Sequence, residues 1–172
     1  MGDPIMNRGF SLVELVIVIA VVGILAGSFV AYVEQSVNMF ETVDNRKEIT
    51  MEARQAMLRI IREVRQIRDN TSIVSANANG ISFFGVADSL YTLTYSGTPG
   101  TNLMFQRGAV SAAIATGVDS LSIQYFKSDG TAAVPVVSPG VTDVHRVSVY
   151  LRLASGGDKV SFSTETFLRN LQ

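Results

Sequence analysis

The sequence contains no cysteine and a single histidine among its 172 residues. The missing cysteine excludes disulfide bonds, thiolate chemistry and cysteine-ligated metal sites. Lys and Arg number 14 against 15 Asp and Glu, so the net charge of −1 gives no general attraction to nucleic acid or anionic lipid. The length fits one domain of roughly 100–150 residues plus an appendage.

Catalytic and metal-binding patterns are also missing from the sequence. His145 lies on an alternating strand pattern, where a lone histidine is usually a packed or surface residue. No Ser/His/Asp set, phosphate-binding glycine loop or zinc-ligand cluster can be assembled. Asp119, Asp129, Asp143 and Asp158 are expected in loops, where they could ligate calcium, but their scatter favours turn-forming roles. We therefore expect no catalytic residues, no metal, no cofactor and no enzymatic activity.

One long apolar run is present near the start. Residues 15–33 carry no charge over 19 positions, which at 1.5 Å per residue gives about 28 Å, enough for a bilayer core. A signal peptide would have a shorter apolar region followed by a small-residue cleavage site. Arg8 precedes the run, and Glu34, Glu41 and Asp44 are the first charges after it. This bias favours a cytoplasmic N-terminus and an external C-terminal part.

Glu14 stands at the edge of this membrane segment. A carboxylate there costs on the order of 2–3 kcal/mol on insertion scales, and such residues usually have a partner. Cleavage between Gly9 and Phe10 would create an amine four residues before Glu14, about one helical turn away. The pair could close within one chain or between neighbouring chains. The alternative is that Glu14 marks the interface boundary of an ordinary signal anchor.

The segment Arg8–Leu15 (RGFSLVEL) resembles the class III leader of type IV pilins and type II secretion pseudopilins. The resemblance implies cleavage between Gly9 and Phe10 by a prepilin peptidase on the cytoplasmic face, and N-methylation of Phe10 by the same enzyme. It also implies that Glu14 docks onto the amine of an adjacent subunit. The expected partners are this peptidase, other pilin or pseudopilin subunits, and the bacterial inner membrane before assembly into a periplasmic or extracellular filament.

Two features of the apolar segment bear on its role within that superfamily. Gly23 and Gly27 form a small-xxx-small pair that could let helices approach closely, although glycine is common in membrane helices. Major pilins often carry proline where Ala31 stands, so its absence favours a minor pilin or pseudopilin. The C-terminal sequence from Phe167 to Asn170 also resembles the tail of several minor pilins and J-class pseudopilins.

The helix is expected to continue from Glu34 to Asn70. Apolar residues recur there at steps of three and four, interleaved with charged ones, and polar turn formers follow Arg68. Five arginines between Arg54 and Arg68 could form a nucleic-acid face. Acidic residues lie among them and no aromatic residues interleave for base stacking, so a solvated face or a subunit contact is the better interpretation.

The remainder of the chain, residues 71–172, is rich in strand patterns. Short β-branched and aromatic runs separated by turn signals predict six strands. They cover residues 80–84, 90–95, 102–106, 121–127, 145–153 and 160–167, the last two forming a hairpin. Residues 109–116 and 131–142 are expected to be loops. An antiparallel sheet packed against one long helix gives an α+β fold, the pilin layout.

Four segments are therefore expected: a leader (1–9, or a shorter one starting at Met6), a transmembrane assembly helix (10–33), its amphipathic continuation (34–70) and an extracytoplasmic sheet domain (71–172). The predicted function is a structural minor pilin or pseudopilin that enters or primes a type IV pilus or type II secretion pseudopilus. Two rivals stay open: a filament-tip binding subunit for adhesion or DNA uptake, and a signal-anchored periplasmic enzyme.

Overall fold

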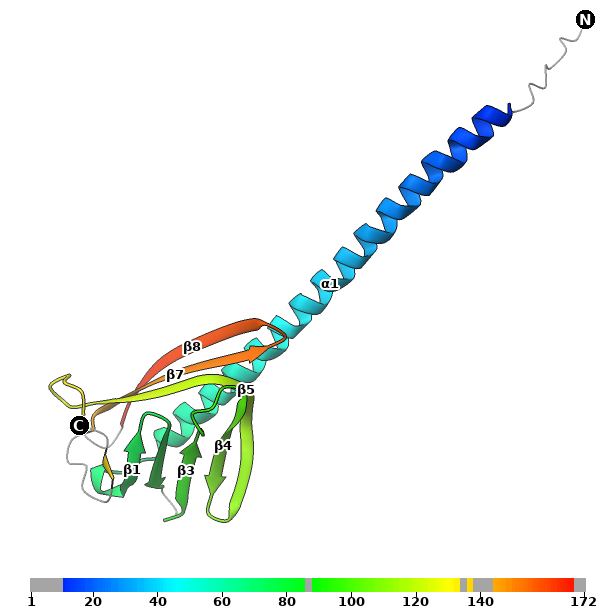
Figure 1. Ribbon diagram of the computed structural model, residues 1–172. Coiled ribbons are helices and arrows are strands. Elements are labelled where there is room, and N and C mark those ends of the chain that lie inside the picture. The colour runs from blue at the N-terminus through cyan, green and yellow to red at the C-terminus, as the bar shows by residue number, and fades with distance from the viewer. Residues whose placement is uncertain (1–10, 86–87, 134–135, 138–143, 169–172) are drawn as a thin grey trace, which may run out of the picture. The chain divides into compact units, whose positions relative to one another are not determined.

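The computed structural model describes residues 11–85, 88–133, 136–137 and 144–168 (Figure 1). It contains one helix, α1 (Leu12–Val64), a 3-10 turn, η1 (Asn70–Ser72), and eight strands. The chain divides into two units, residues 1–43 and 44–172, which we describe separately. The strands are β1 (Ile73–Asn77), β2 (Gly80–Phe84), β3 (Leu90–Thr94), β4 (Thr101–Arg107), β5 (Val110–Phe126), β6 (Val136–Val137), β7 (Arg146–Ser155) and β8 (Asp158–Phe167).

The described part of the first unit, residues 11–43, is the beginning of α1. Every side chain in it is exposed except Ser36, which is half-buried. Two of its serine hydroxyls bond within the helix: Ser28 Oγ donates to the Ile24 carbonyl at 3.0 Å, and Ser36 Oγ donates to the Tyr32 carbonyl at 2.9 Å. Such bonds to the carbonyl four residues earlier satisfy a hydroxyl without water. These serines therefore need no outside partner, and the apolar side chains of the segment are exposed.

In the second unit, the last five turns of α1 bury one face against the sheet. The buried residues recur at steps of three and four, as a one-sided amphipathic helix requires; they are Ile49, Ala53, Ala56, Met57, Ile60, Glu63 and Val64. Ala53 and Ala56 are almost completely buried. Their small side chains let the helix backbone lie close to the strands that it covers.

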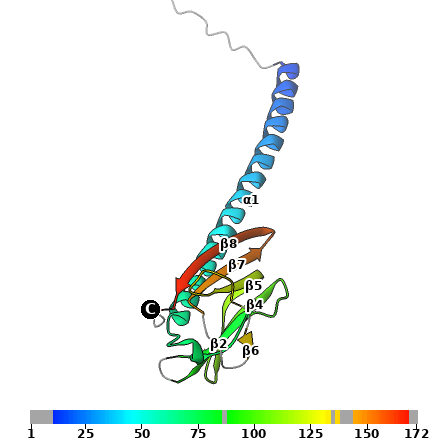
Figure 2. The ribbon, with the colours of Figure 1, turned by 90° about the vertical axis from the view of Figure 1, so that its left-hand side faces the viewer.

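All strand pairs in the sheet are antiparallel, in the order β6-β1-β2-β3-β4-β5-β7-β8. Figure 2 shows β8, β7, β5 and β4 following one another along the sheet. β1 to β5 form a meander, and β7 and β8 form a hairpin with Ser155 opposite Asp158. Gly156 and Gly157 fill the turn with φ of 58° and 90°, the left-handed region that two-residue hairpin turns need. The expected α+β class, with one long N-terminal helix on an antiparallel sheet, is confirmed.

β5 is a 17-residue strand that belongs to both parts of the sheet. Its first part pairs with β4 and its second part pairs with β7, and the register shifts between Val118 and Ser120. Gly117 has φ of 58°, and a Cβ there would lie 2.7 Å from the Ala154 carbonyl oxygen. Only glycine fits this close approach. The strand therefore changes partner at Gly117 and at the bulge that follows it.

Two tyrosine hydroxyl groups bond backbone carbonyls where strands end. Tyr125 donates to the carbonyls of Asn77 (3.1 Å) and Gly80 (3.0 Å), the residues that flank the β1–β2 turn. Tyr95 donates to the Val118 carbonyl at 3.1 Å, beside the β5 bulge. Burial raises the pKa of both phenols, because the charged form would lose its hydration. These hydroxyl groups remain donors and join β5 to β1, β2 and the end of β3.

Two sequence predictions need correction. Residues 109–116 are not a loop, because Val110 onward pairs with β4 across a turn at Gly108. Ser111, Ala112 and Ala113 at the start of this strand are small and exposed, so they carry little strand signal. The helix ends at Val64 rather than Asn70. Gln66 and Ile67 donate to the carbonyls three residues earlier, which tightens the last turn.

Two strands of the structure were not predicted. One is β1, and the other is β6, which lies inside the predicted loop 131–142. Residues 134, 135 and 138–142 of that loop are outside the described residues.

The buried face of α1 gives a direct stability prediction. Ile60 is 2% exposed and Leu58 is 62% exposed on the opposite side of the same helix. We expect Ile60→Ala to lower the free energy of unfolding by about 2–5 kcal/mol, since it removes core contacts and leaves a cavity. Denaturant unfolding of the full chain in detergent, followed by the circular dichroism of the sheet, measures this. The control Leu58→Ala should change the value by less than about 0.5 kcal/mol, and equal losses would contradict the packing described.

Candidate assembly and processing site

The predicted cleavage pair, Gly9 and Phe10, lies outside the described residues, so its cleavage stays a prediction. The described chain begins at Ser11, immediately before α1. Ser11 accepts hydrogen bonds from the next turn: its Oγ from the Glu14 amide at 3.3 Å, and its carbonyl oxygen from the Leu15 amide at 3.1 Å. Ser11 is therefore the N-cap of the helix. The pattern Ser-x-x-Glu before an apolar run signals such a cap, and the sequence prediction overlooked it.

Glu14 occupies the third helical position, where the partial positive charge of the helix N-terminus favours a carboxylate. That effect contributes about 0.3–1 kcal/mol. Placing a carboxylate at the edge of a membrane costs about 2–3 kcal/mol, so the helix terminus offsets only part of it. Within the described residues, Glu14 makes no ion pair. The remaining cost is what a positively charged partner would offset.

The apolar segment that follows contacts nothing else in its own unit. α1 is long and apolar enough to cross a membrane, judged by length and composition. Its large apolar side chains are exposed along the whole span from Leu12 to Val33. Exposing apolar surface of this kind to water costs roughly 25 cal/mol per Å². The segment therefore requires lipid or other helices around it.

Gly23 and Gly27 lie one turn apart on this span. A Cβ built at either position would meet nothing within 4 Å. The described chain itself therefore has no steric need for glycine at these two positions. Their proposed role in close helix packing stays a prediction about contacts with other molecules.

Four of the five arginines between Arg54 and Arg68 have contacts inside the protein. The Arg59 guanidinium carbon lies 5.0 Å from the centroid of the Phe105 ring, and Arg65 Nε donates to Thr166 Oγ1 at 3.1 Å. Arg62 pairs with Glu63 at 3.3 Å, and Arg68 pairs with Asp88 at 3.4 Å. These side chains are held by contacts within the sheet-bearing unit, which counts against a nucleic-acid face.

His145 packs edge-on against Phe167, with ring centroids 5.8 Å apart, so the prediction of a packed or surface histidine is confirmed.

Asp129 lies in a turn and accepts from the Thr131 amide at 2.8 Å, as predicted for a turn-forming aspartate. Asp158 begins β8, and Asp143 is outside the described residues. In the described part of the chain, no three His, Asp or Glu side chains group in a way that could hold a metal ion.

Asp119 is not in a loop, contrary to expectation. It lies inside β5 at the bulge, with its side chain 14% exposed, and it pairs with Arg152 and with Lys159 at 3.1 Å. The hydrogen bond from Lys159, together with Arg152, holds the pKa of the Asp119 carboxyl below its usual value. Both carboxylate oxygens are therefore occupied by cations from β7 and β8, and the bulge is fixed to the hairpin.

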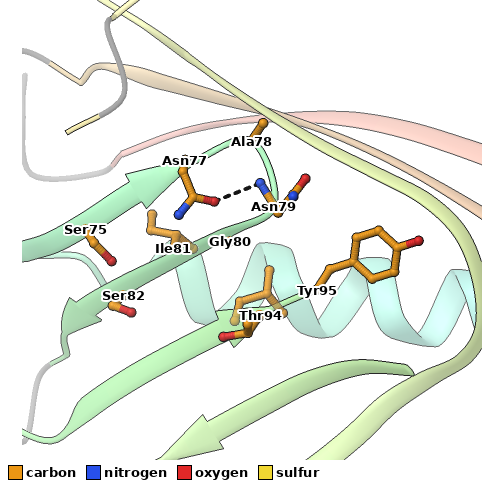
Figure 3. A pocket seen from close by; sticks show the side chains of 10 residues that line it. Ser75, Asn77, Ala78, Asn79, Gly80, Ile81, Ser82, Thr94 and Tyr95 are labelled. Atoms are coloured by element: carbon orange, nitrogen blue, oxygen red, sulfur yellow. Dashed lines mark hydrogen bonds between the residues drawn. The ribbon is translucent and has the colours of Figure 1, made fainter. Parts of the chain in front are cut away.

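A hollow of about 490 Å³ lies at the β1–β2 turn and the end of β3 (Figure 3). It is uncharged, and several of its polar groups are already used within the hairpin. Asn77 Oδ1 accepts from the Asn79 amide at 2.9 Å, the contact drawn in Figure 3, and Ser82 Oγ donates to Thr92 Oγ1 at 3.2 Å. Asn77 therefore serves the turn, and Ser82 joins β2 to β3.

Fold and N-terminal segment together define a membrane-anchored protein of the pilin-like fold class, in which one apolar helix continues into the helix of a sheet domain. Residues 6–30 match the family model described as the prokaryotic N-terminal methylation motif. The match spans Gly9, Phe10, Glu14 and both glycines of the apolar segment, and it supports a type IV pilin-like protein. No curated protein matches the chain.

The Asp119 cluster predicts an acid-sensitive contribution to stability. Because the folded-state pKa of Asp119 lies below the ordinary 3.8, the contribution is complete well above pH 3.8 and is lost as pH falls through the folded value. Unfolding free energies measured between about pH 6 and pH 3 should therefore fall less steeply in Asp119→Asn than in the wild type. Asp44→Asn, at an exposed aspartate that forms no ion pair with the described residues, is the control. An unchanged acid slope in Asp119→Asn would contradict this assignment.

Proposed function

We propose that this chain is a structural subunit of a type IV pilin-like filament, processed by a prepilin peptidase and inserted through its N-terminal helix. The proposal rests on two features that coincide near the N-terminus of the chain. A methylation motif over residues 6–30 coincides with a helix whose apolar side chains its own unit leaves exposed. Such a helix lies in the inner membrane before assembly and packs against neighbouring helices afterwards.

In this proposal, the peptidase cleaves between Gly9 and Phe10 and methylates the new amine of Phe10. The Glu14 carboxylate then pairs with the amine of an adjacent subunit. The energetic reason is the cost of a carboxylate at the membrane edge, which the helix N-terminus offsets only partly. Close approach of neighbouring helices at Gly23 and Gly27 would supply dispersion contacts that bulkier residues would prevent.

Within the superfamily we place the chain among the minor pilins or pseudopilins, of a type II secretion system or a type IV pilus. The support is the absence of the helix-breaking proline at Ala31. In α1 the backbone runs from Leu12 to Val64 as one helical element. The role proposed is structural and non-catalytic, in the periplasm or outside the cell, with the N-terminus starting on the cytoplasmic side. A filament-tip binding role gains no support from the hollow at the β1–β2 turn, because its lining is uncharged and Asn77 and Ser82 already bond within the sheet.

Processing can be tested in cells that contain a prepilin peptidase. We expect the mature chain to begin with N-methyl-phenylalanine at Phe10, which intact-mass and N-terminal peptide mass spectrometry detect. Gly9→Ala tests the pair at the cleavage site and should leave the leader attached in most molecules. A wild-type chain that retains residues 1–9 in the presence of active peptidase would refute the proposal.

The role of the Glu14 charge can be separated from the cap at the start of the helix. The bond to Ser11 Oγ comes from the backbone of Glu14, so Glu14→Gln keeps it and removes only the charge. We expect Glu14→Gln and Glu14→Ala to be cleaved normally but to enter filaments at least tenfold less, a loss of about 1.4 kcal/mol or more. Quantitative blots of sheared filaments measure this, with Ser11→Ala as the cap control. Normal incorporation of Glu14→Gln would show that the charge has no role in assembly.

A further inference from the structure

A second charged site lies in the sheet-bearing unit, residues 44–172. A cleft of about 560 Å³ is lined by Arg59, Arg62 and Glu63 from α1 and by Phe105 and Arg107 from β4. Its rim includes Val110, which is 72% exposed at the start of β5. We call it the arginine cleft, after Arg59, Arg62 and Arg107.

Arg59 has an unmet hydrogen-bonding requirement in this cleft. Its Nε is buried and has no hydrogen-bond partner within the described part of the chain. A buried donor left unpaired costs about 1–3 kcal/mol, so native structures rarely retain one without a reason. The guanidinium group is held over the Phe105 ring, and that of Arg107 lies 5.3 Å from the Tyr91 ring centroid. Both cations are thus positioned by aromatic rings rather than by carboxylates.

The charges lining the cleft do not balance. Glu63 is its single carboxylate, and that group already accepts from Arg62 Nη2 at 3.3 Å and from Gln66 Nε2 at 2.6 Å. Three guanidinium groups therefore face one carboxylate, leaving an excess of two positive charges. A planar guanidinium group presents paired N–H donors that match a carboxylate. The cleft has the chemistry of a carboxylate-binding site.

Complementary carboxylates are present on the same chain, just beyond the apolar span. Glu34 and Glu41 are exposed on α1 and lie seven residues apart, so they share one face of the helix. No Lys or Arg stands three or four positions from either residue. Neither forms an ion pair with any described residue. These two carboxylates therefore lack a positively charged partner, which the arginine cleft could provide.

We propose that the arginine cleft binds the Glu41 carboxylate of a second copy of this chain. The inference rests on the proposed filament function, in which copies pack side by side through α1. Glu41 precedes Arg59 by 18 residues in the sequence, so the contact joins different positions of the two copies and sets the offset between them. The pair supplies a negative charge for the guanidinium groups of the cleft and a cation for Glu41. It adds a contact specific to this chain beyond the pairing of Glu14.

The contact can be detected by cross-linking in the full-length processed protein, because the chain has no native cysteine. One copy carries Asn38→Cys, about one turn before Glu41, and the other carries Val110→Cys on the rim of the cleft. A short bis-maleimide should join them as a covalent dimer in membranes or filaments. Asn38→Cys with Ser161→Cys, on an exposed position of β8, is the matched control and should give little product.

The charge dependence identifies the binding pair. Glu41→Gln should lower the yield of the dimer about tenfold, as expected for the loss of a charge-assisted hydrogen bond. Arg59→Gln should do the same, and Glu41→Arg combined with Arg59→Glu should recover part of the yield. Glu48→Gln is the matched control on the same helix and should leave the yield unchanged. Because Glu41 is exposed and contacts no core residue, its substitution tests the contact without threatening the fold.

A third measurement separates this contact from assembly itself. Copies with Val30→Cys in the apolar span report on helix packing when oxidised. Val30 dimers without the Asn38–Val110 product would overturn the cleft contact and leave the filament function standing; absence of both products would overturn both. An undiminished yield in Glu41→Gln would also refute the pair. If inorganic phosphate raised the Tm of the wild type but not of Arg59→Gln, while Glu41→Gln cross-linked normally, the cleft would be a site for small anions instead.

Discussion

The apolar surface of α1 between Leu12 and Val33 is the constraint on which the rest of the structure depends. Its side chains are exposed and contact nothing else in their own unit, so this surface must be covered by lipid or by other helices. Ser28, within this segment, bonds its hydroxyl to the Ile24 carbonyl one turn earlier and so needs no water. The same helix therefore has two kinds of surroundings: its first turns need lipid or other helices, and its later turns bury one face against a sheet.

Attachment of that helix to the sheet is both apolar and polar. The core face runs from Ile49 to Val64, and charged contacts lie around it. Arg46 pairs with Asp158 at 2.8 Å, and Glu52 accepts from the amide and hydroxyl of Thr116 at 2.7 and 2.9 Å. These contacts connect α1 to β5 and to the β7–β8 turn. Surface pairs of this kind add little energy individually, but they fix the rotation of the helix on the sheet.

The sequence predicted the fold well where periodicity was strong. β2 has the predicted bounds, and the β7–β8 hairpin follows from two alternating runs around a double glycine. The start of β5 was missed because its alanines and serine are exposed, and small side chains at an exposed edge carry no alternation. Asp119 was misplaced for a related reason: an aspartate usually indicates a turn, whereas here Lys159 and Arg152, both far along the chain, hold it inside a strand.

The candidate assembly site was predictable because its signals are local. The residues from Arg8 to Leu15 are eight consecutive positions of the sequence, and the match over residues 6–30 covers them. The arginine cleft was not predictable, since it brings Arg59 of the helix together with Arg107 of β4, and no spacing rule connects those positions. Sequence patterns identified the arginines of α1 but not the aromatic rings against which they lie.

The shared strand β5 has a consequence for how the sheet folds. Neither the β1–β4 meander nor the β7–β8 hairpin has a complete set of neighbours without it, since β4 pairs with its first part and β7 with its second. Local hairpins form early because closing short loops costs little entropy. The two halves then depend on one strand, and on the bend at Gly117, to acquire a common core. Unfolding of this unit is therefore expected to be a single cooperative transition rather than the separate melting of two halves.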